Sequence, residues 1–224
     1  MFAPIFDFAH ATRVVPGSRI YRRFGKRLLD LSLVVLAAPF VLPLLAVLVV
    51  LTMATGLVPP LYAQTRVGRD GRPFRMWKIR TMVRDADGLL ERLIATDPEI
   101  AREWMTRQKL TRDPRVTPFG RLLRRTSLDE LPQLWNVLNG TMSLVGPRPF
   151  TPEQRRHYRN ARPDVAYYRV RPGLTGLWQV GPRHLSAFED RASHDDLYWQ
   201  DLSLALDLSI LMRTFGAVLR GSGC

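Results

Sequence analysis

The most distinctive feature of the chain is a long stretch without charge near its N-terminus. Asp30 and Arg66 are separated by 35 uncharged residues, and the 21 residues of Leu31–Leu51 are apolar except for Ser32 and two prolines. A helix of that length, rising about 1.5 Å per residue, could reach across a hydrocarbon core of about 30 Å. We therefore predict a membrane segment within residues 19–60. Residues 1–18 lack helical periodicity and form an N-terminal arm to which we assign no role.

Two topologies fit this segment, a helix that spans the bilayer and a re-entrant helix that returns to the face it entered. Pro39 and Pro43 lie in mid-segment, where proline removes a hydrogen bond and kinks a helix. Both flanks are basic: Arg13, Arg19, Arg22, Arg23, Lys26 and Arg27 precede the segment, and Arg66, Arg69, Arg72, Arg75, Lys78 and Arg80 follow it. The positive-inside rule needs an asymmetry that these flanks do not offer. The pattern therefore favours the re-entrant helix, with both ends on the cytoplasmic face.

The rest of the chain, residues 61–224, has the polar and apolar alternation of a water-facing domain. Residues 62–82 hold a Gly-Arg-Asp-Gly turn between two β-like stretches and predict a hairpin. Asp97 followed by Pro98 is typical of a helix start, and we expect this helix to reach about Leu110. Residues 121–138 are predicted to be mostly helical. Residues 197–219 predict one long amphipathic helix that suits either a core or a bilayer surface.

Charge and cysteine content narrow the classes of function. The chain has 33 Lys and Arg against 20 Asp and Glu, a formal net charge of +13. Such a field attracts phosphates, whether in nucleic acid, anionic lipid or a phosphorylated small molecule. The single cysteine, Cys224, excludes an intrachain disulfide framework. The four histidines lack the spacing of zinc ligands, and no glycine-rich phosphate loop is present in the sequence.

Two adjacent carboxylates, Asp129 and Glu130, follow Arg124 and Arg125 and are the strongest candidates for chemistry. Neighbouring residues on a helix diverge by about 100°, so the two carboxylates would divide the work. One would attack or transfer a proton while the other holds a metal ion. The alternative is structural, because Ser127-x-x-Glu130 also matches a capping box at a helix start. The residues alone leave both interpretations open.

Further candidates for phosphate binding are single basic residues in defined surroundings. Arg148 lies between Pro147 and Pro149, which would hold its guanidinium rigidly for capture of a phosphate. The alternative is an ordinary turn with a solvated arginine. Lys78 and Arg80 lie in the second half of the predicted hairpin, either at a phosphate site or on a solvated strand edge.

Several segments taken together resemble the bacterial sugar transferase family, the small monotopic phosphoglycosyl transferases. The resemblance covers roughly residues 20–222. The segments follow in this order: KRLLD (26–30), QTRVG (64–68), KIRTM (78–82), DPRVTPFG (113–120), SLDELPQLWNVL (127–138), MSLVGPRP (142–149), RPGLTGLWQV (171–180) and DLSIL (207–211).

The resemblance implies a role for each matching residue. Asp129 falls on the family's nucleophile and Glu130 on the residue that helps to hold Mg²⁺, with Asp129 as a possible second ligand. Arg148 falls on the arginine that contacts phosphate, and Leu42-Pro43 on the break of the re-entrant helix. Basic residues at positions near the active site are Lys78, Arg80, Arg124 and Arg125.

The resemblance also implies a fold, a reaction and partners. The fold is α+β and mostly helical: a re-entrant helix-break-helix, a small β-hairpin and amphipathic interfacial helices around an active site at the membrane surface. The reaction transfers a sugar 1-phosphate from a UDP-sugar to undecaprenyl phosphate through a phospho-aspartyl intermediate, releases UMP and initiates exopolysaccharide or other glycoconjugate assembly. The location is the bacterial inner membrane, with both termini and the catalytic domain on the cytoplasmic face.

Some consequences of the resemblance stay open. Residues 102–117 are similar to enzymes that transfer galactose 1-phosphate, which favours UDP-galactose over UDP-glucose. No nucleic acid partner is expected, and a homodimer is compatible with the sequence. Thr141 stands where relatives often have an acidic residue. The alternative function is a basic membrane-tethered binding or scaffold protein without catalysis, for which Asp129 would be dispensable.

Overall fold

The structure is a computed structural model that describes residues 19–107, 110–155, 158, 166–181 and 191–219. Within these residues the fold is mostly helical, with two small two-stranded sheets, as expected for the predicted α+β class. The helices are α1 (Lys26–Ala54), α2 (Ala86–Thr96), α3 (Pro98–Arg107), α4 (Pro118–Arg125), α5 (Gln133–Leu138), α7 (Leu177–Val180), α8 (Arg191–Asp201) and α9 (Leu204–Leu219). The strands are β1 (Leu61–Val67), β2 (Pro73–Ile79), β3 (Ser143–Val145) and β4 (Gly173–Thr175).

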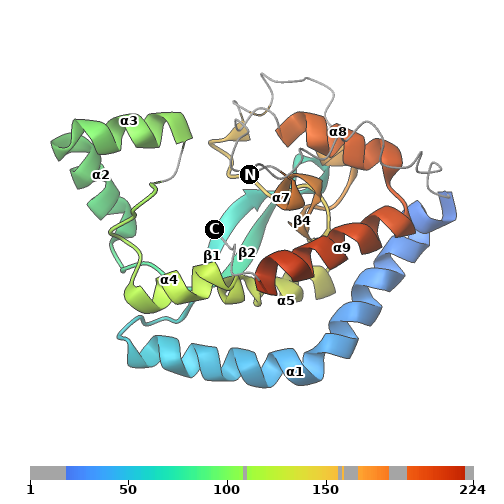
Figure 1. Cartoon of the computed structure of the whole chain (residues 1–224), viewed down its shortest axis with the longest axis horizontal. Helices are drawn as coiled ribbons and strands as arrows, with labels where there is room; N and C mark the ends of the chain where they lie inside the picture. The colour runs from blue at the N-terminus through green and yellow to red at the C-terminus, as the bar shows by residue number, and fades with distance from the viewer. Residues whose placement is uncertain (1–18, 108–109, 156–157, 159–165, 182–190, 220–224) are drawn as a thin grey trace, which may run out of the picture.

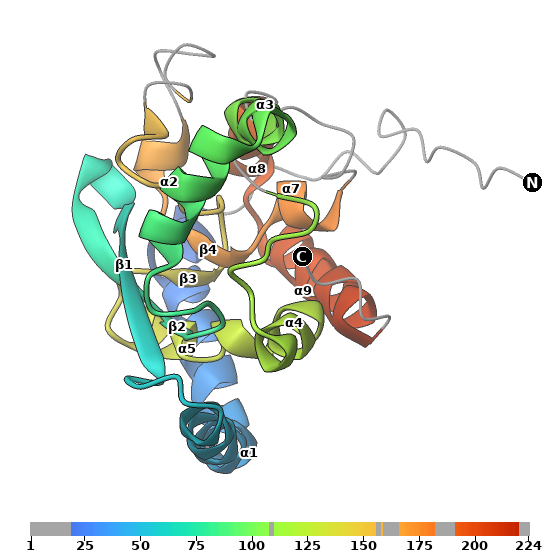
Figure 2. The ribbon, with the colours of Figure 1, turned by 90° about the vertical axis from the view of Figure 1, so that its left-hand side faces the viewer.

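Helix α1 contains the apolar segment and bends into two arms. A π-helical stretch, Tyr21–Gly25, leads into it, and the combined helix Tyr21–Ala54 is long and apolar enough to cross a membrane. Figure 1 shows one arm along the side of the domain and the second beneath it, and Figure 2 looks along the second arm. Pro39 and Pro43 both lie inside the helix, where each removes a backbone hydrogen bond. The helix is not interrupted at the expected break, Leu42-Pro43, but runs through both prolines and bends along its length (Figure 1).

Both arms of α1 pack against the same domain, while the part between them is exposed. Val34 in the first arm belongs to the main hydrophobic core, and Leu48 in the second packs with Ile79 of β2 and Leu123 of α4. Between these contacts Phe40 is 79% exposed. Large exposed apolar side chains in one segment are typical of a surface that meets a membrane or a partner.

Buried polar contacts attach the first arm of α1 to the rest of the fold. The Asp30 carboxylate accepts hydrogen bonds from Ser143 Oγ at 2.8 Å and from the Leu144 amide at 3.0 Å, both in β3. Lys26 Nζ donates to Asp207 Oδ2 of α9 at 2.8 Å. Because buried charges are stable only when they are paired, these contacts determine where the first arm docks.

The hairpin prediction for residues 62–82 is confirmed. Strands β1 and β2 pair antiparallel, with Gln64 opposite Met76 and Tyr62 opposite Lys78. Phe74 and Met76 of β2 are buried in the main core, while Lys78 near the end of the strand is partly exposed. The hairpin thus presents Lys78 beside the short 3₁₀ turn η4 (Leu128–Glu130), with which β2 is in contact.

Two predicted helices are interrupted in the structure. Residues 121–138 divide into α4, η4 and α5, because Ser127 adopts a left-handed conformation with φ of 57°. Residues 197–219 divide between α8 and α9 at Leu202 and Ser203. At the start of α9 the Ser203 hydroxyl oxygen accepts from the Leu206 amide at 3.3 Å, as a capping side chain does. The start of α3 is confirmed, since Asp97 Oδ1 accepts from the Glu99 amide at 2.9 Å.

Candidate active site

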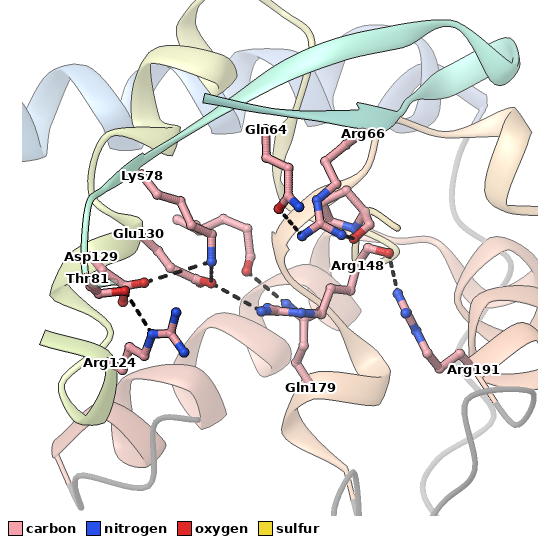
Figure 3. Close-up of polar contacts among 12 residues, drawn as sticks. Gln64, Arg66, Lys78, Thr81, Arg124, Asp129, Glu130, Arg148, Gln179 and Arg191 are labelled. Atoms are coloured by element: carbon pink, nitrogen blue, oxygen red, sulfur yellow. Dashed lines mark hydrogen bonds and ion pairs between the residues drawn. The ribbon is translucent and has the colours of Figure 1, made fainter. Parts of the chain in front are cut away.

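Three charged side chains from three separate segments meet at one end of the hairpin. Lys78 Nζ of β2 lies 2.8 Å from Glu130 Oε1 of η4. Arg148, in the segment after β3, has its Nη2 3.2 Å from the same oxygen. Figure 3 shows the Lys78 and Arg148 side chains converging on Glu130. The structure therefore brings together three of the residues that the sequence singled out.

Asp129 lies beside this group, in η4, and is 5% exposed. Its Oδ2 is 3.9 Å from Lys78 Nζ, so Lys78 is an ion-pair partner of both carboxylates. The capping-box interpretation is wrong, because Ser127 makes no side-chain capping bond and the Glu130 carboxylate turns to Lys78 and Arg148. The left-handed Ser127 ends α4 and starts the tight turn on which the two carboxylates sit.

The two carboxylates have opposite electrostatic surroundings. Burial raises the pKa of Glu130, but the charges and hydrogen bonds of Lys78 and Arg148 outweigh it and lower the pKa to about 2. Burial also raises the pKa of Asp129, and the negative charge of Glu130 raises it further. The positive charge of Lys78 lowers this pKa but does not cancel the rise. Glu130 is thus ionised at neutral pH, whereas burial disfavours the ionised form of Asp129, and perturbed carboxylates of this kind are common at functional sites.

Other basic side chains lie close to Arg148. Arg191 of α8 donates a hydrogen bond to the Arg148 backbone carbonyl. Arg66 of β1 donates to Gln64 Oε1 at 2.6 Å and lies near Arg148 (Figure 3). Burial, together with the charges of Arg148 and Arg191, lowers the pKa of Arg66 to about 10. Cations crowded in this way favour an anionic ligand that relieves their repulsion.

Two glutamines that the sequence does not single out lie beside these residues. Gln133, at the start of α5, and Gln179, in α7, each have a buried side-chain atom without a hydrogen-bond partner in the described part of the chain: Gln133 Nε2 and Gln179 Oε1. Gln133 lines a small cavity together with Arg66, Glu130 and Arg148. Buried polar atoms are normally satisfied, so these point to a polar ligand. Gln133 lies in the SLDELPQLW segment, but nothing in the sequence distinguished it from a helix-surface residue.

The other basic residues predicted for the site have different surroundings. Arg124 Nε donates to Thr81 Oγ1 at 2.9 Å (Figure 3). The charge of Arg124 offsets part of the rise in the pKa of Asp129. Arg80 instead donates to the Pro59 carbonyl at 2.8 Å and stacks over the Tyr62 ring. Arg125 is exposed on α4, and among the described residues it has no ion pair. A role for Arg80 or Arg125 in substrate binding stays a prediction.

Thr141 follows α5 and takes part in packing. Its hydroxyl donates to Asn139 Oδ1 at 2.7 Å and accepts from Asn136 Nδ2 at 3.0 Å. Asn136 in turn accepts from the Trp77 amide at 3.0 Å and donates to the Arg75 carbonyl at 2.8 Å. Thr141 therefore supports the contact between α5 and β2, the strand that carries Lys78.

The carboxylates of Asp129 and Glu130 could supply some of the ligands of a magnesium ion, with substrate and water supplying the others. In the described residues no cluster of three or more His, Cys, Asp or Glu side chains is present. Mg²⁺ is commonly bound through one or two carboxylates together with substrate phosphates and water. Asp129 and Glu130 supply hard oxygen donors of that kind beside cations that suit a phosphate.

Comparisons with known proteins show which family the chain resembles. A model of the family described as bacterial sugar transferase matches residues 21–221. A UDP-galactose-lipid carrier transferase of Erwinia amylovora is 44% identical over 202 residues, which are 90% of this chain but 42% of that protein. The exopolysaccharide production protein ExoY of Sinorhizobium fredii is 39% identical over 199 residues, 89% of this chain and 87% of that protein.

A third relative is named for a different sugar. A UDP-glucose:undecaprenyl-phosphate glucose-1-phosphate transferase of Caulobacter vibrioides is 39% identical over 210 residues, 91% of this chain and 73% of that protein. The chain spans less than half the length of the Erwinia protein. Since the family model covers nearly all of the chain and the similarity extends along the same residues, the chain belongs to the bacterial sugar transferase family.

Proposed function

We propose that this protein transfers a sugar 1-phosphate from a UDP-sugar to undecaprenyl phosphate, with release of UMP. The observation that carries the proposal is Asp129, a buried carboxylate of raised pKa, beside a Glu130 that Lys78 and Arg148 hold ionised. A nucleophile beside fixed positive charge suits attack on a phosphate, because the charges stabilise the oxygens of the transition state.

The transfer proceeds in two balanced steps. An Asp129 carboxylate oxygen attacks the phosphorus attached to the sugar, a new O–P bond forms, and the bond to the UMP oxygen breaks. An oxygen of undecaprenyl phosphate then attacks the same phosphorus and Asp129 leaves as a carboxylate. A covalent intermediate divides one difficult exchange between two anions into two easier ones.

Lys78, Arg148 and Arg66 serve the diphosphate of the donor in this scheme. Arg148 and Lys78 are already oriented by Glu130, so little side-chain entropy is lost when a phosphate binds. The unpartnered atoms Gln133 Nε2 and Gln179 Oε1 are available to polar groups of the bound donor. When bound at Asp129 and Glu130, Mg²⁺ would neutralise part of the diphosphate charge.

The proposed placement at the membrane is monotopic. Both arms of α1 pack on one domain, and exposed apolar side chains lie along both arms and between them, which supports a helix that enters and returns. A spanning helix would carry its two ends to opposite faces, about 30 Å apart. The exposed apolar residues of α9 recur every three or four positions, which suits a helix lying on the bilayer surface: Leu204, Leu208, Met212, Phe215 and Val218.

For the donor we propose UDP-galactose first and UDP-glucose second, in the initiation of an exopolysaccharide. The names of the similar proteins support both sugars: galactose for the Erwinia protein and glucose for the Caulobacter one. The name ExoY of the Sinorhizobium relative, an exopolysaccharide production protein, supports the pathway class.

The test is UMP release by the detergent-purified protein, given Mg²⁺, undecaprenyl phosphate and a panel of UDP-sugars. We expect UMP from one preferred sugar and none from Asp129→Asn under the same conditions. Asp85→Asn, which replaces an exposed aspartate, is the control and should keep wild-type activity. UMP release that Asp129→Asn leaves intact would contradict the proposed nucleophile. No UMP from any sugar would favour the non-catalytic scaffold.

A further inference from the structure

A second basic cavity, separate from the proposed active site, lies at the start of α1. Its volume is about 480 Å³, and it shares no lining residue with the cavity at Glu130. Five arginines from three segments line it: Arg22, Arg23, Arg27, Arg69 and Arg171. These come from the beginning of α1, from the hairpin turn and from the segment before β4. No acidic side chain lines this cavity among the described residues.

Backbone carbonyls hold several of these guanidinium groups in place. Arg27 donates to the Val137 and Leu138 carbonyls at 2.5 and 2.8 Å, and Arg171 Nε donates to the Gly140 carbonyl at 2.8 Å. Arg22 donates to the Gln200 carbonyl at 2.8 Å. A guanidinium has five N–H donors, so each of these bonds leaves others that can serve a ligand. The anchored groups form a preorganised cluster rather than a set of floppy surface side chains.

The cluster carries an excess of positive charge, although Asp70 Oδ2 lies 3.8 Å from Arg69 Nε. Burial lowers the pKa of Arg171, and the charges of Arg27 and Arg69 lower it further. An anion in the cavity would offset this repulsion, and a phosphate matches guanidinium geometry through paired hydrogen bonds.

Apolar side chains adjoin the arginines. Phe24, Leu28 and Leu31 also line the cavity, and the first two are 63% and 68% exposed. They stand where α1 changes from a basic to an apolar sequence. A free inorganic anion cannot cover this apolar surface, whereas the acyl chains of a lipid can bury it. We propose that this cavity binds the phosphate of an anionic phospholipid, with the lipid chains against Phe24 and Leu28.

The site is independent of catalysis and can be tested by binding. The full-length protein in detergent would be titrated with short-chain phosphatidylglycerol, short-chain phosphatidylcholine, glycerol 3-phosphate and inorganic phosphate, and binding followed by native mass spectrometry. We expect phosphatidylglycerol to bind at least about tenfold more tightly than the other three. The choline cation of phosphatidylcholine offsets its phosphate charge, and glycerol 3-phosphate and inorganic phosphate lack chains that could cover Phe24 and Leu28.

The variant that tests the cavity is Arg23→Gln/Arg69→Gln, which removes two charges from two segments without touching the carbonyl contacts described above. It should lose the preference for phosphatidylglycerol. The matched control is Arg72→Gln/Arg75→Gln, which removes the same charge from the same hairpin outside the cavity and should keep the preference.

Three outcomes would overturn the proposal. They are equal binding of both lipids, an equal loss in the control pair, and binding of glycerol 3-phosphate or inorganic phosphate as tight as that of phosphatidylglycerol. The last would identify a soluble phosphate as the ligand. Lipid preference without UMP release would separate failure of the proposed activity from failure of this inference.

Discussion

The two basic clusters of this protein differ in how their cations are held. At the proposed active site Glu130 holds Lys78 and Arg148 in place through ion pairs of 2.8 and 3.2 Å. At the start of α1, backbone carbonyls orient Arg27 and Arg171, and no acidic side chain is among the described residues that line the cavity.

The difference indicates that one cluster suits catalysis and the other suits binding of a ligand. A cation held by a carboxylate keeps its position whether or not substrate is bound, as repeated turnover requires. Arginines that backbone carbonyls orient, as Arg22, Arg27 and Arg171 are, keep charge available for a ligand that stays bound. The first arrangement suits substrate phosphates that react and leave, and the second suits a phosphate that stays bound.

The largest effect is expected from removing the shared anion of the first cluster. Glu130→Gln leaves Lys78 and Arg148 without their common partner, so we expect UMP release to fall at least about a hundredfold. Phosphatidylglycerol binding should not change, because Glu130 does not line the second cavity. The exposed Glu153→Gln serves as the control. Activity of Glu130→Gln near the wild-type rate would remove the distinction between the clusters.

Changing the shape of a cation while keeping its charge should have the next largest effect. Arg148→Lys loses the planar fork that can bind a phosphate through two hydrogen bonds. Because a hydrogen bond to a charged group contributes about 1.5–3 kcal/mol, kcat/KM should fall about ten- to a hundredfold. Arg84→Lys, at an exposed arginine between β2 and α2, should change it less than about twofold. Equal effects at both positions would show that only net charge matters.

The two carboxylates should affect stability with opposite signs at neutral pH. The pKa of Glu130 is lowered from 4.5 to about 2, so its ionised form stabilises the fold above pH 4.5, and this contribution is lost as the pH falls toward 2. The pKa of Asp129 is raised above 3.8, so the stability of the fold falls as the pH rises from 3.8 to the raised pKa, and the loss is complete above it.

Thermal unfolding at pH 7 measures this difference. Asp129→Asn should raise Tm and Glu130→Gln should lower it, by about 2–4 °C for each kcal/mol in a chain of this size. A lower Tm for Asp129→Asn would contradict the view that Asp129 is held at a cost for the sake of reactivity.

The smallest effect is expected at Thr141. Thr141→Ala removes the hydroxyl that bonds Asn136 and Asn139, at a cost of about 1 kcal/mol of stability. Because the effect reaches Lys78 only through β2, UMP release should stay within about threefold of wild type. Loss of activity far beyond the loss of stability would make Thr141 part of the catalytic machinery.

The sequence predicted the parts of the fold that local chemistry determines. The Gly-Arg-Asp-Gly turn identified the hairpin, and Asp97-Pro98 identified the start of α3, because turns and caps depend on neighbouring residues. The apolar run identified α1, and its two prolines predicted the change of direction. The convergence of Lys78, Glu130 and Arg148 followed from the family resemblance, since no spacing rule connects them.

What the sequence did not predict depends on tertiary contacts. Ser127 adopts a left-handed backbone that its residue type does not require, and this interrupts the helix predicted over 121–138. Lys78 and Arg80 would share a face of a longer strand, but β2 ends at Ile79 and Arg80 turns to Pro59. Gln133 became recognisable only through an unsatisfied atom beside a cavity.

The most direct test of the account is the intact mass of the protein after incubation with Mg²⁺ and UDP-galactose or UDP-glucose in the absence of undecaprenyl phosphate. We predict an added mass equal to one sugar phosphate on the wild-type protein, removed when undecaprenyl phosphate is supplied and absent from Asp129→Asn. An unmodified wild-type protein that nevertheless releases UMP once the lipid is present would contradict covalent catalysis by Asp129.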